Sequence, residues 1–101
     1  MRTKQQIWQS KANKAMKTSA QILLDNVAPI SKIKQLIKLM SKLLNEGEKY
    51  DDEASKPVFK LLLSHQKQIF QLGTQLGADL ASMKANSNLY VDHPVYGRLR
   101  Y

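Results

Sequence analysis

The chain has 101 residues, of which 43% are hydrophobic, and it carries a formal net charge of +8 without a cysteine. This length is typical of one domain with a core of modest size, and the lack of cysteine excludes disulfides, thiolate metal ligands and cysteine catalysis. Uninterrupted apolar runs reach only three residues, as at Leu61 to Leu63, so no segment is expected to span a bilayer. The first ten residues lack the apolar stretch of a signal peptide, so we expect a cytoplasmic protein.

The positive charge is concentrated in the first part of the chain. Residues 1–42 hold nine Lys or Arg against Asp25 alone, whereas residues 43–83 hold four Lys against six acids. Such a surface favours the phosphates of nucleic acid or of anionic lipid head groups. A lysine-rich surface that only keeps a small helical protein in solution accounts for the charge about as well.

The first predicted helix runs from about Thr3 to Asp25. Its buried side recurs at steps of three and four residues and consists of Trp8, Ala12, Ala15, Met16, Ser19, Leu23 and Val27. Lys11, Lys14 and Lys17 lie opposite. The stripe is rich in small residues, so a second helix can approach closely. We expect Trp8, the large exception, to cap one end of the core.

A break is predicted from Asn26 to Pro29, and a second helix begins near Pro29 or Ser31. Gly47 is its expected C-terminal cap. The expected buried face is Ile30, Ile33, Leu36, Ile37, Met40, Leu43 and Leu44. Lys34, Lys38 and Lys42 are spaced at i, i+4 and i+8 on its outer face, where like charges repel without an acid to offset them. This lysine ladder suggests an anionic partner.

The acidic stretch from Glu46 to Glu53 is predicted to connect the second helix to the next. Its carboxylates precede a helix start, where they interact well with the helix dipole. Ser55 is the expected N-cap. The ligand spacing of a calcium loop is absent, so no metal site is expected here.

The stretch from Ser55 to Lys84 is predicted to form the centre of the fold. One apolar stripe comprises Val58, Leu61, Leu62, Ile69, Leu72, Leu76, Leu80 and Met83, and a second comprises Phe59, Leu63 and Phe70. Glycine costs about 1 kcal/mol inside a helix, so a break near Gly73 is favoured.

The predicted fold is therefore an all-α, small antiparallel helical bundle in residues 1–86. Four helices are favoured, with helices at Ser55–Leu72 and Thr74–Ala85, and three helices with a long kinked last helix are the alternative.

Residues 87–101 are predicted to form an irregular C-terminal tail. Asn88, Pro94 and Gly97 interrupt any helical period, yet three of the four tyrosines lie in this stretch. A tail of this composition either packs back on the bundle or presents a recognition surface, because Tyr and Arg concentrate binding energy.

No catalytic or cofactor motif is visible. His65 projects onto the main apolar face, where a hydrogen-bonded core histidine is the simplest interpretation, and His93 lies in a turn of the tail. No carboxylate pair, glycine-rich loop or Ser/His/Asp arrangement has supporting context. We therefore expect neither an enzyme nor a small-molecule substrate, metal or cofactor.

In its layout the chain resembles the bacteriocin immunity proteins of Gram-positive bacteria, of the pediocin-like or lactococcin A-like type. The shared features are about 100 residues, no cysteine, lysine-rich amphipathic helices and an aromatic, basic C-terminal tail. The resemblance implies a helical bundle that protects the mannose phosphotransferase membrane components from the cell's own pore-forming peptide. It also implies that the tail selects the bacteriocin, through the candidate residues Tyr90, Tyr96, Arg98, Leu99, Arg100 and Tyr101. The lysines of the first two helices would then hold the protein near the anionic inner leaflet of the membrane.

The main alternative is a small nucleic-acid-binding accessory protein of phage or plasmid type. Its support is the charge of residues 1–42 and the lysine ladder at Lys34, Lys38 and Lys42. Against it, the chain has only three arginines and none lies in the second helix, although Arg is the preferred reader of base edges. A helical adaptor that dimerises near Gly73 and Gly77 is a third hypothesis.

Overall fold

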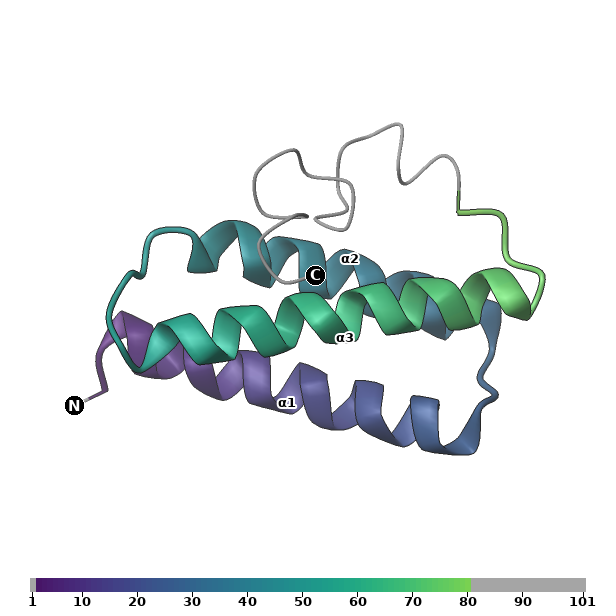
Figure 1. The fold of residues 1–101 in the computed structure, drawn as a ribbon, viewed down its shortest axis with the longest axis horizontal. Helices are drawn as coiled ribbons and strands as arrows, with labels where there is room; N and C mark the ends of the chain where they lie inside the picture. Colours follow the sequence, from purple (N-terminus) through teal and green to yellow (C-terminus); the bar gives the residue numbers. More distant parts are fainter. Residues whose placement is uncertain (1, 81–101) are drawn as a thin grey trace.

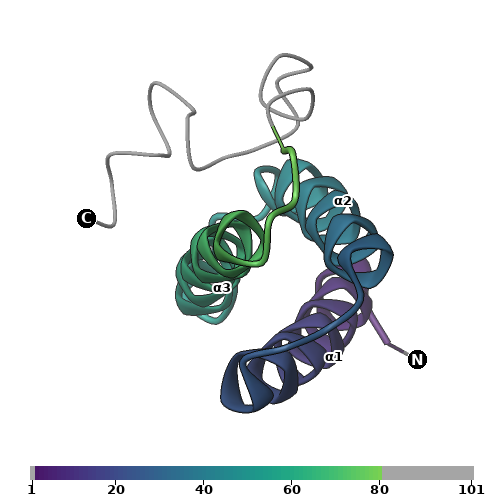
Figure 2. The ribbon, with the colours of Figure 1, turned by 90° about the vertical axis from the view of Figure 1, so that its right-hand side faces the viewer.

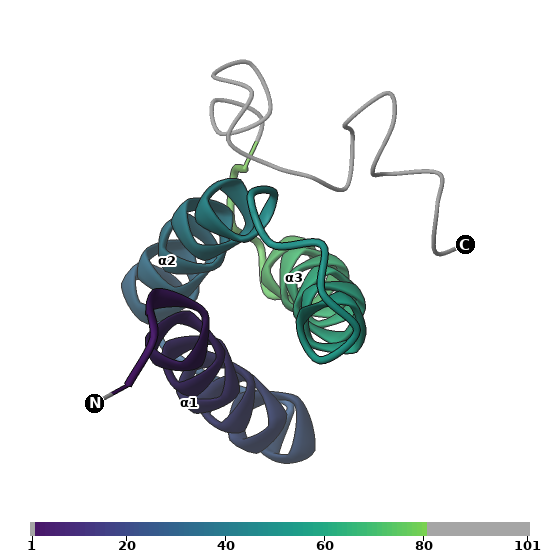
Figure 3. The same ribbon diagram turned by 90° about the vertical axis from the view of Figure 1, so that its left-hand side faces the viewer.

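The computed structural model describes residues 2–80, and in this range the chain forms an all-helical, strand-free bundle. Helix α1 spans Lys4–Asp25, α2 spans Ile30–Gly47 and α3 spans Ser55–Gln75. In Figure 1, α1 and α3 run from left to right and α2 runs back between their ends, so consecutive helices are antiparallel. The two end views show each helix beside the other two (Figures 2 and 3). The prediction of an antiparallel bundle is confirmed for these residues.

The predicted helix end near Gly73 lies three residues too early, and the fourth helix predicted from Thr74 is wrong for the described residues. Helix α3 continues through Gly73 to Gln75, and residues 76–80 are not helical, so the three-helix alternative holds in place of the four-helix arrangement. Gly73 lies where a Cβ would be 3.0 Å from Ile33 Cγ2 and 3.2 Å from Leu80 Cδ1. The glycine is thus explained by close packing inside a helix and not by a helix end.

The end of α3 is set by Gly77. Its φ of 91° is a conformation that favours glycine. The Gly77 N–H donates to the Thr74 carbonyl and the Ala78 N–H donates to the Gly73 carbonyl, which is the bond pattern of a Schellman motif. Two otherwise unpaired carbonyls of the last turn are satisfied in this way, and the chain turns so that Leu80 is buried.

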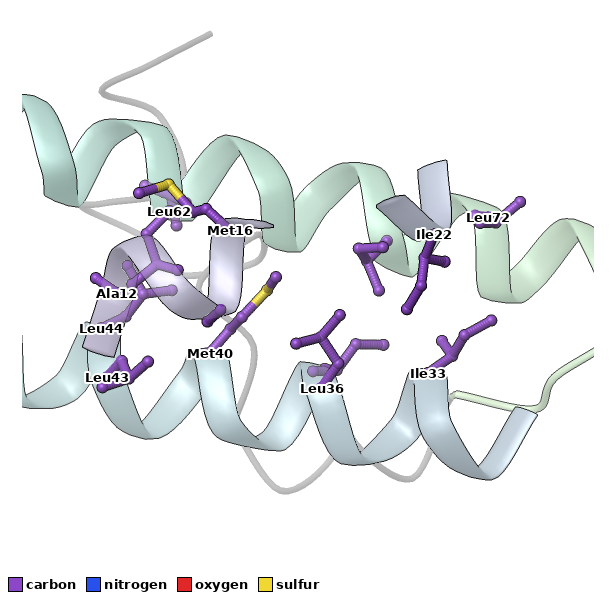
Figure 4. Packing of buried hydrophobic residues seen from close by; sticks show 14 of the residues in the cluster. Ala12, Met16, Ile22, Ile33, Leu36, Met40, Leu43, Leu44, Leu62 and Leu72 are labelled. Carbon is purple, nitrogen blue, oxygen red and sulfur yellow. The ribbon is translucent and has the colours of Figure 1, made fainter. Parts of the chain in front are cut away.

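The core lies between the three helices. Figure 4 shows Ile33, Leu36, Met40 and Leu43 in a row along α2, pointing toward side chains of α1 and α3. The buried apolar residues are Trp8, Ala12, Ala15, Met16, Ile22, Ile33, Leu36, Ile37, Met40, Leu43, Leu44, Leu62, Leu63, Ile69, Leu72 and Leu80. The predicted face of α2 is confirmed except at Ile30, which is 38% exposed in the first residue of the helix.

The predicted buried side of α1 is wrong at its end. Asn26 ends the helix in the left-handed conformation, with φ at 59°, so Val27 leaves the helical register and is 63% exposed. Ile22 is buried and Leu23 is only half-buried, so the buried stripe of α1 closes with Ile22.

The buried face of α3 lies between the two apolar stripes that the sequence suggests. Its middle is formed by Ser55, Gln66 and Gly73, which are buried together with Leu62 and Ile69. The face is rotated toward the second stripe, and Leu61 of the first stripe is consequently 56% exposed. The sequence prediction leaves Ser55 and Gln66 out of the buried face because they are polar, although at about 100° per residue both project between the two apolar stripes.

Hydrogen bonds between helices satisfy these buried polar side chains. Gln66 Nε2 donates to Ser41 Oγ at 2.7 Å and to the Ile37 carbonyl at 3.3 Å, which joins α3 to α2. Gln9 Nε2 donates to Ser55 Oγ at 3.0 Å, which joins α1 to α3. Burying a polar group costs free energy unless it is paired, and each of these groups has a partner.

Side chains cap the first turns of α1 and α3, and the cap of α3 differs from expectation. Helix α1 begins with a capping box, because Thr3 Oγ1 accepts from the Gln6 N–H while Gln6 Oε1 accepts from the Thr3 N–H. At α3 the expected cap, Ser55, is buried, and the Asp52 carboxylate accepts from the Ser55 N–H instead. The hydrogen bond with the Ser55 side chain is the main cause that lowers the pKa of Asp52.

Trp8 closes the end of the core at which α2 finishes, as expected. The indole is fully buried, its Nε1 donates to the Leu43 carbonyl at 2.7 Å, and its ring lies 5.6 Å from the Tyr50 ring. The ring also lies against Gly47, where an added Cβ would be 2.8 Å from Trp8 Cε2 and 3.1 Å from Phe59 Cδ2. Gly47 is the last residue of α2 and is followed by Glu48 in a right-handed conformation, so its predicted role as a left-handed cap is wrong.

We predict that Gly47→Ala destabilises the bundle. Overpacking a core costs about 1–3 kcal/mol, which exceeds the gain of up to about 1 kcal/mol from replacing a helical glycine. The free energy of unfolding, measured by urea titration with far-UV circular dichroism, should therefore fall, by about 1 kcal/mol for a cost near the middle of this range.

The Trp8→Phe background provides the control for this prediction, because it removes the ring atoms that the new methyl group would meet. Gly47→Ala should cost markedly less there, so the double variant should lose less stability than the sum of the two single variants in a double-mutant cycle. A Gly47→Ala protein as stable as the unmodified chain would contradict the proposed contact.

Candidate partner-binding furrow

A furrow runs along the outside of the bundle between α1 and α2. It consists of two open hollows of about 390 and 530 Å³ that share Lys14, Thr18 and Lys32. The mid-bundle hollow is lined by Lys11, Lys14, Ala15, Thr18, Lys32, Gln35, Leu36, Leu39 and Leu43. The turn-end hollow is lined by Lys14, Lys17, Thr18, Gln21, Ile22, Asp25, Val27, Ala28, Pro29 and Lys32.

The floor of the mid-bundle hollow is apolar. Leu36 and Leu43 are buried beneath it, whereas Leu39 is 46% exposed within it. On the α1 side the floor is formed by Ala15 and Thr18, and the Thr18 hydroxyl donates to the Lys14 carbonyl, so it turns toward its own helix. Short side chains on α1 opposite leucines on α2 leave the hollow open.

The rim of the furrow is basic. Lys11, Lys14, Lys17 and Lys32 surround it, and Asp25 is the acid among its lining residues, held by hydrogen bonds from Gln21 Nε2 at 3.1 and 3.2 Å. Within residues 2–80, no carboxylate pairs with any of these four lysines. The furrow therefore combines an apolar floor with uncompensated positive charge, a surface that suits an anionic, partly apolar partner.

The structure brings together only half of the basic residues that the sequence suggests. Lys11, Lys14 and Lys17 line the furrow, but Lys34, Lys38 and Lys42 do not: Lys38 and Lys42 are exposed on another face of α2, and Lys34 is half-buried. The sequence pattern did not indicate Lys32, because this residue does not belong to the lysine ladder of Lys34, Lys38 and Lys42. Its spacing of seven residues from Leu39 is the signal that places both on one face of α2.

The tail candidates lie outside the described residues. Tyr90, Tyr96, Arg98, Leu99, Arg100 and Tyr101 fall beyond Leu80, as do the predicted boundary at residue 86 and the turn containing His93.

A Ser–His contact joins α1 to α3. Ser19 Oγ and His65 Nδ1 share a hydrogen bond of 2.8 Å. Ser19 is fully buried, so a substrate has no access to its hydroxyl, and the pair resembles a structural tie more than a nucleophile with its base. Burial lowers the pKa of His65 because it disfavours the charged imidazolium.

Residues 2–80 contain neither a cluster of metal ligands nor a helix that could span a bilayer. No group of three or more His, Asp or Glu side chains converges there as metal ligands would. None of the three helices combines the length and hydropathy that a bilayer span requires.

Comparisons with protein-family models, with curated proteins and with solved structures find no match to this chain.

We predict that the bundle loses stability as the pH falls from about 7.5 to about 5. Below about pH 6.5 an unfolded histidine takes up a proton, whereas the lowered pKa of folded His65 resists protonation. The unfolded state then binds more protons, so the free energy of unfolding decreases with falling pH until the folded His65 also titrates. Urea titrations across this range measure the effect.

Two glutamine variants locate the source of this pH dependence. His65→Gln should flatten it, because glutamine has no proton to gain and retains hydrogen-bonding groups for Ser19. His93→Gln is the matched control, because it removes the other histidine of the chain and retains His65, so the loss of stability at low pH should persist there. Equal pH dependence in His65→Gln and in the unmodified protein would show that another group is responsible.

Proposed function

We propose that this protein is a bacteriocin immunity protein, which protects the producing cell from a pore-forming class II bacteriocin at the cytoplasmic side of its membrane receptor. The expected partners are the bacteriocin, the mannose phosphotransferase membrane components, or both. The proposal rests on the architecture and composition described above, and the observation that carries it furthest is the mid-bundle hollow.

The mid-bundle hollow offers the chemistry that a segment of a membrane receptor would need. Leu39 is partly exposed over the buried Leu36 and Leu43, and Lys11 and Lys32 stand at the rim. An amphipathic helix or loop with acidic flanks can place apolar side chains on such a floor and carboxylates beside the lysines. This arrangement supports recognition of a macromolecule, and no chemical step is needed for protection.

The nucleic-acid alternative has one specific observation in its favour. Lys38 and Lys42 are exposed on α2 outside the furrow, as a contact with a phosphate backbone would require. However, Arg2 is the only arginine within residues 2–80, and few direct readers of base edges are therefore available there. Strong binding of plasmid DNA at physiological salt in a gel-shift assay would favour this alternative over immunity.

Expression in a bacteriocin-sensitive strain, followed by challenge with a panel of class II bacteriocins, tests the proposed function. Tolerance of at least one panel member should rise above that of the vector control. The double variant Lys11→Glu/Leu39→Ser should lose about tenfold or more of this protection, which corresponds to about 1.4 kcal/mol of lost binding free energy.

Lys60→Glu is the matched control for this experiment, because Lys60 is an exposed lysine of α3 that does not line the furrow. It should protect as well as the unmodified protein. If the strain tolerates no bacteriocin better than the vector control does, the proposed function loses its basis. If the double variant and Lys60→Glu lose protection equally, the hollow has no specific role in protection.

A second prediction concerns the tail. Under the proposed function, deletion of residues 89–101 should abolish protection while far-UV circular dichroism still reports a helical bundle, because α1, α2, α3 and the buried residues from Trp8 to Leu80 all remain in the shortened chain. Retained protection by the shortened chain would show that Tyr90, Tyr96, Arg98, Leu99, Arg100 and Tyr101 do not select the bacteriocin.

A further inference from the structure

The end of the bundle at the α1–α2 turn exposes apolar side chains. Leu24 is 80% exposed and Val27 is 63% exposed, and Ile30 beside them is 38% exposed. Three of the six exposed large hydrophobic residues in the described chain therefore lie within seven positions. The turn itself, residues 26–29, carries no charge. Figure 2 looks onto this end of the bundle.

Lysines flank these apolar residues. Val27 lines the turn-end hollow together with Lys14, Lys17 and Lys32. Leu24 lies seven residues after Lys17, on the same side of α1, which faces away from the core. We call Leu24, Val27, Lys14, Lys17 and Lys32 the tip patch. It pairs a protruding apolar turn with positive charge on both adjoining helices.

The opposite end of the bundle carries most of the acids. Within residues 2–80, five of the seven carboxylates lie from Glu46 to Glu53, in the last turn of α2 and the connection to α3 (Figure 3). The acids nearest the tip patch in sequence and fold are Asp25 and Asp79. Arg2, Lys4, Lys49 and Lys56 lie at the same end and nearly balance these acids. An anionic surface therefore attracts the tip end more strongly than the other end, which orients the molecule.

We propose that the tip patch docks on the surface of an anionic phospholipid bilayer, with Leu24 and Val27 inserted among the lipid head groups and Lys14, Lys17 and Lys32 beside the phosphates. This inference deepens the proposed function, and its biological setting rests on it. The binding itself is a property of the patch and can be measured without any bacteriocin.

A bilayer fits the tip patch better than a protein or a nucleic acid does. Protein interfaces concentrate Trp, Tyr and Arg, and none of these belongs to the patch, since the described Trp8 and Tyr50 lie at the other end of the bundle. A phosphate backbone offers no apolar partner to the two protruding aliphatic side chains, so nucleic acid does not account for them. The chain's own residues 81–101 carry Lys84, Arg98 and Arg100 against Asp92, so their charge disfavours the patch.

Sedimentation with vesicles tests the docking. The protein should bind equimolar phosphatidylcholine and phosphatidylglycerol vesicles and should bind pure phosphatidylcholine vesicles far more weakly. Replacing Lys14, Lys17 or Lys32 by glutamine should lower the partition coefficient about fivefold for each lysine. Leu24→Ser/Val27→Ser should lower it by roughly tenfold or more through lost apolar burial.

Three control variants are available on the same bundle. Leu61→Ser and Lys60→Gln remove an exposed leucine and an exposed lysine of α3, and both should leave binding unchanged. Asp25→Asn removes the acid beside the patch and should raise the partition coefficient about fivefold. This substitution should not harm the fold, because a carboxylate at the end of α1 opposes the helix dipole.

The absence of native cysteine allows a direct test of lipid contact. Val27→Cys, labelled with an environment-sensitive dye, should shift its emission to the blue when anionic vesicles are added, whereas labelled Leu61→Cys should not. Equal binding to neutral and anionic vesicles, or equal shifts at both positions, would overturn the proposal. So would vesicle binding that survives Leu24→Ser/Val27→Ser while depending on the lysines, since charge alone would then explain it.

The result is independent of the protection assay. If the protein confers immunity but does not bind vesicles, the docking is refuted and the proposed function stands. Vesicle binding in a protein that confers no immunity would leave the docking standing without that function.

Discussion

The contact between Trp8 and Gly47 fixes the arrangement of the helices. The indole fills the space that a side chain at position 47 would occupy, and it also donates a hydrogen bond to the Leu43 carbonyl. Both interactions join the first helix to the last two turns of the second. Trp8 is the largest buried side chain of α1, whose other buried residues are Ala12, Ala15, Met16, Ser19 and Ile22. It therefore sets the position of α1 along α2 and closes the end of the core.

The same small residues that bring α1 close to the core also shape its outer surface. Where Ala15 and Thr18 face leucines of α2, the helices leave an open furrow whose rim carries the lysines of α1 together with Lys32. Basic charge and exposed apolar area therefore coincide along one side and at one end, while the acids collect at the α2–α3 connection. The separation of charge follows from the order of segments in the chain, because antiparallel helices place the α1–α2 turn and the α2–α3 connection at opposite ends.

Much of the fold could be predicted from periodicity and breakers, and the failures have physical causes. The break at Asn26 to Pro29 and the buried face of α2 follow from a proline and from a regular apolar stripe. The roles of Gly47 and Gly73 could not be predicted, because a glycine chosen for close packing looks the same in sequence as one chosen for a left-handed turn. Only part of the furrow could be predicted. The lysines opposite the α1 stripe were predicted from its periodicity, whereas Lys32 lies beside them because of the way α2 is rotated against α1.

The polar row on α3, which consists of the buried residues Ser55 and Gln66, limits the helices to one alignment. Apolar side chains tolerate sliding and rotation, since one leucine contact can replace another with little change in energy. In the observed register the Gln66 amide donates to Ser41 and to the Ile37 carbonyl, and Ser55 accepts from Gln9. A third helix displaced by one turn would bury these groups unpaired, at about 1–3 kcal/mol for each. The row thus excludes neighbouring registers, so that a core of interchangeable aliphatic residues adopts a single alignment.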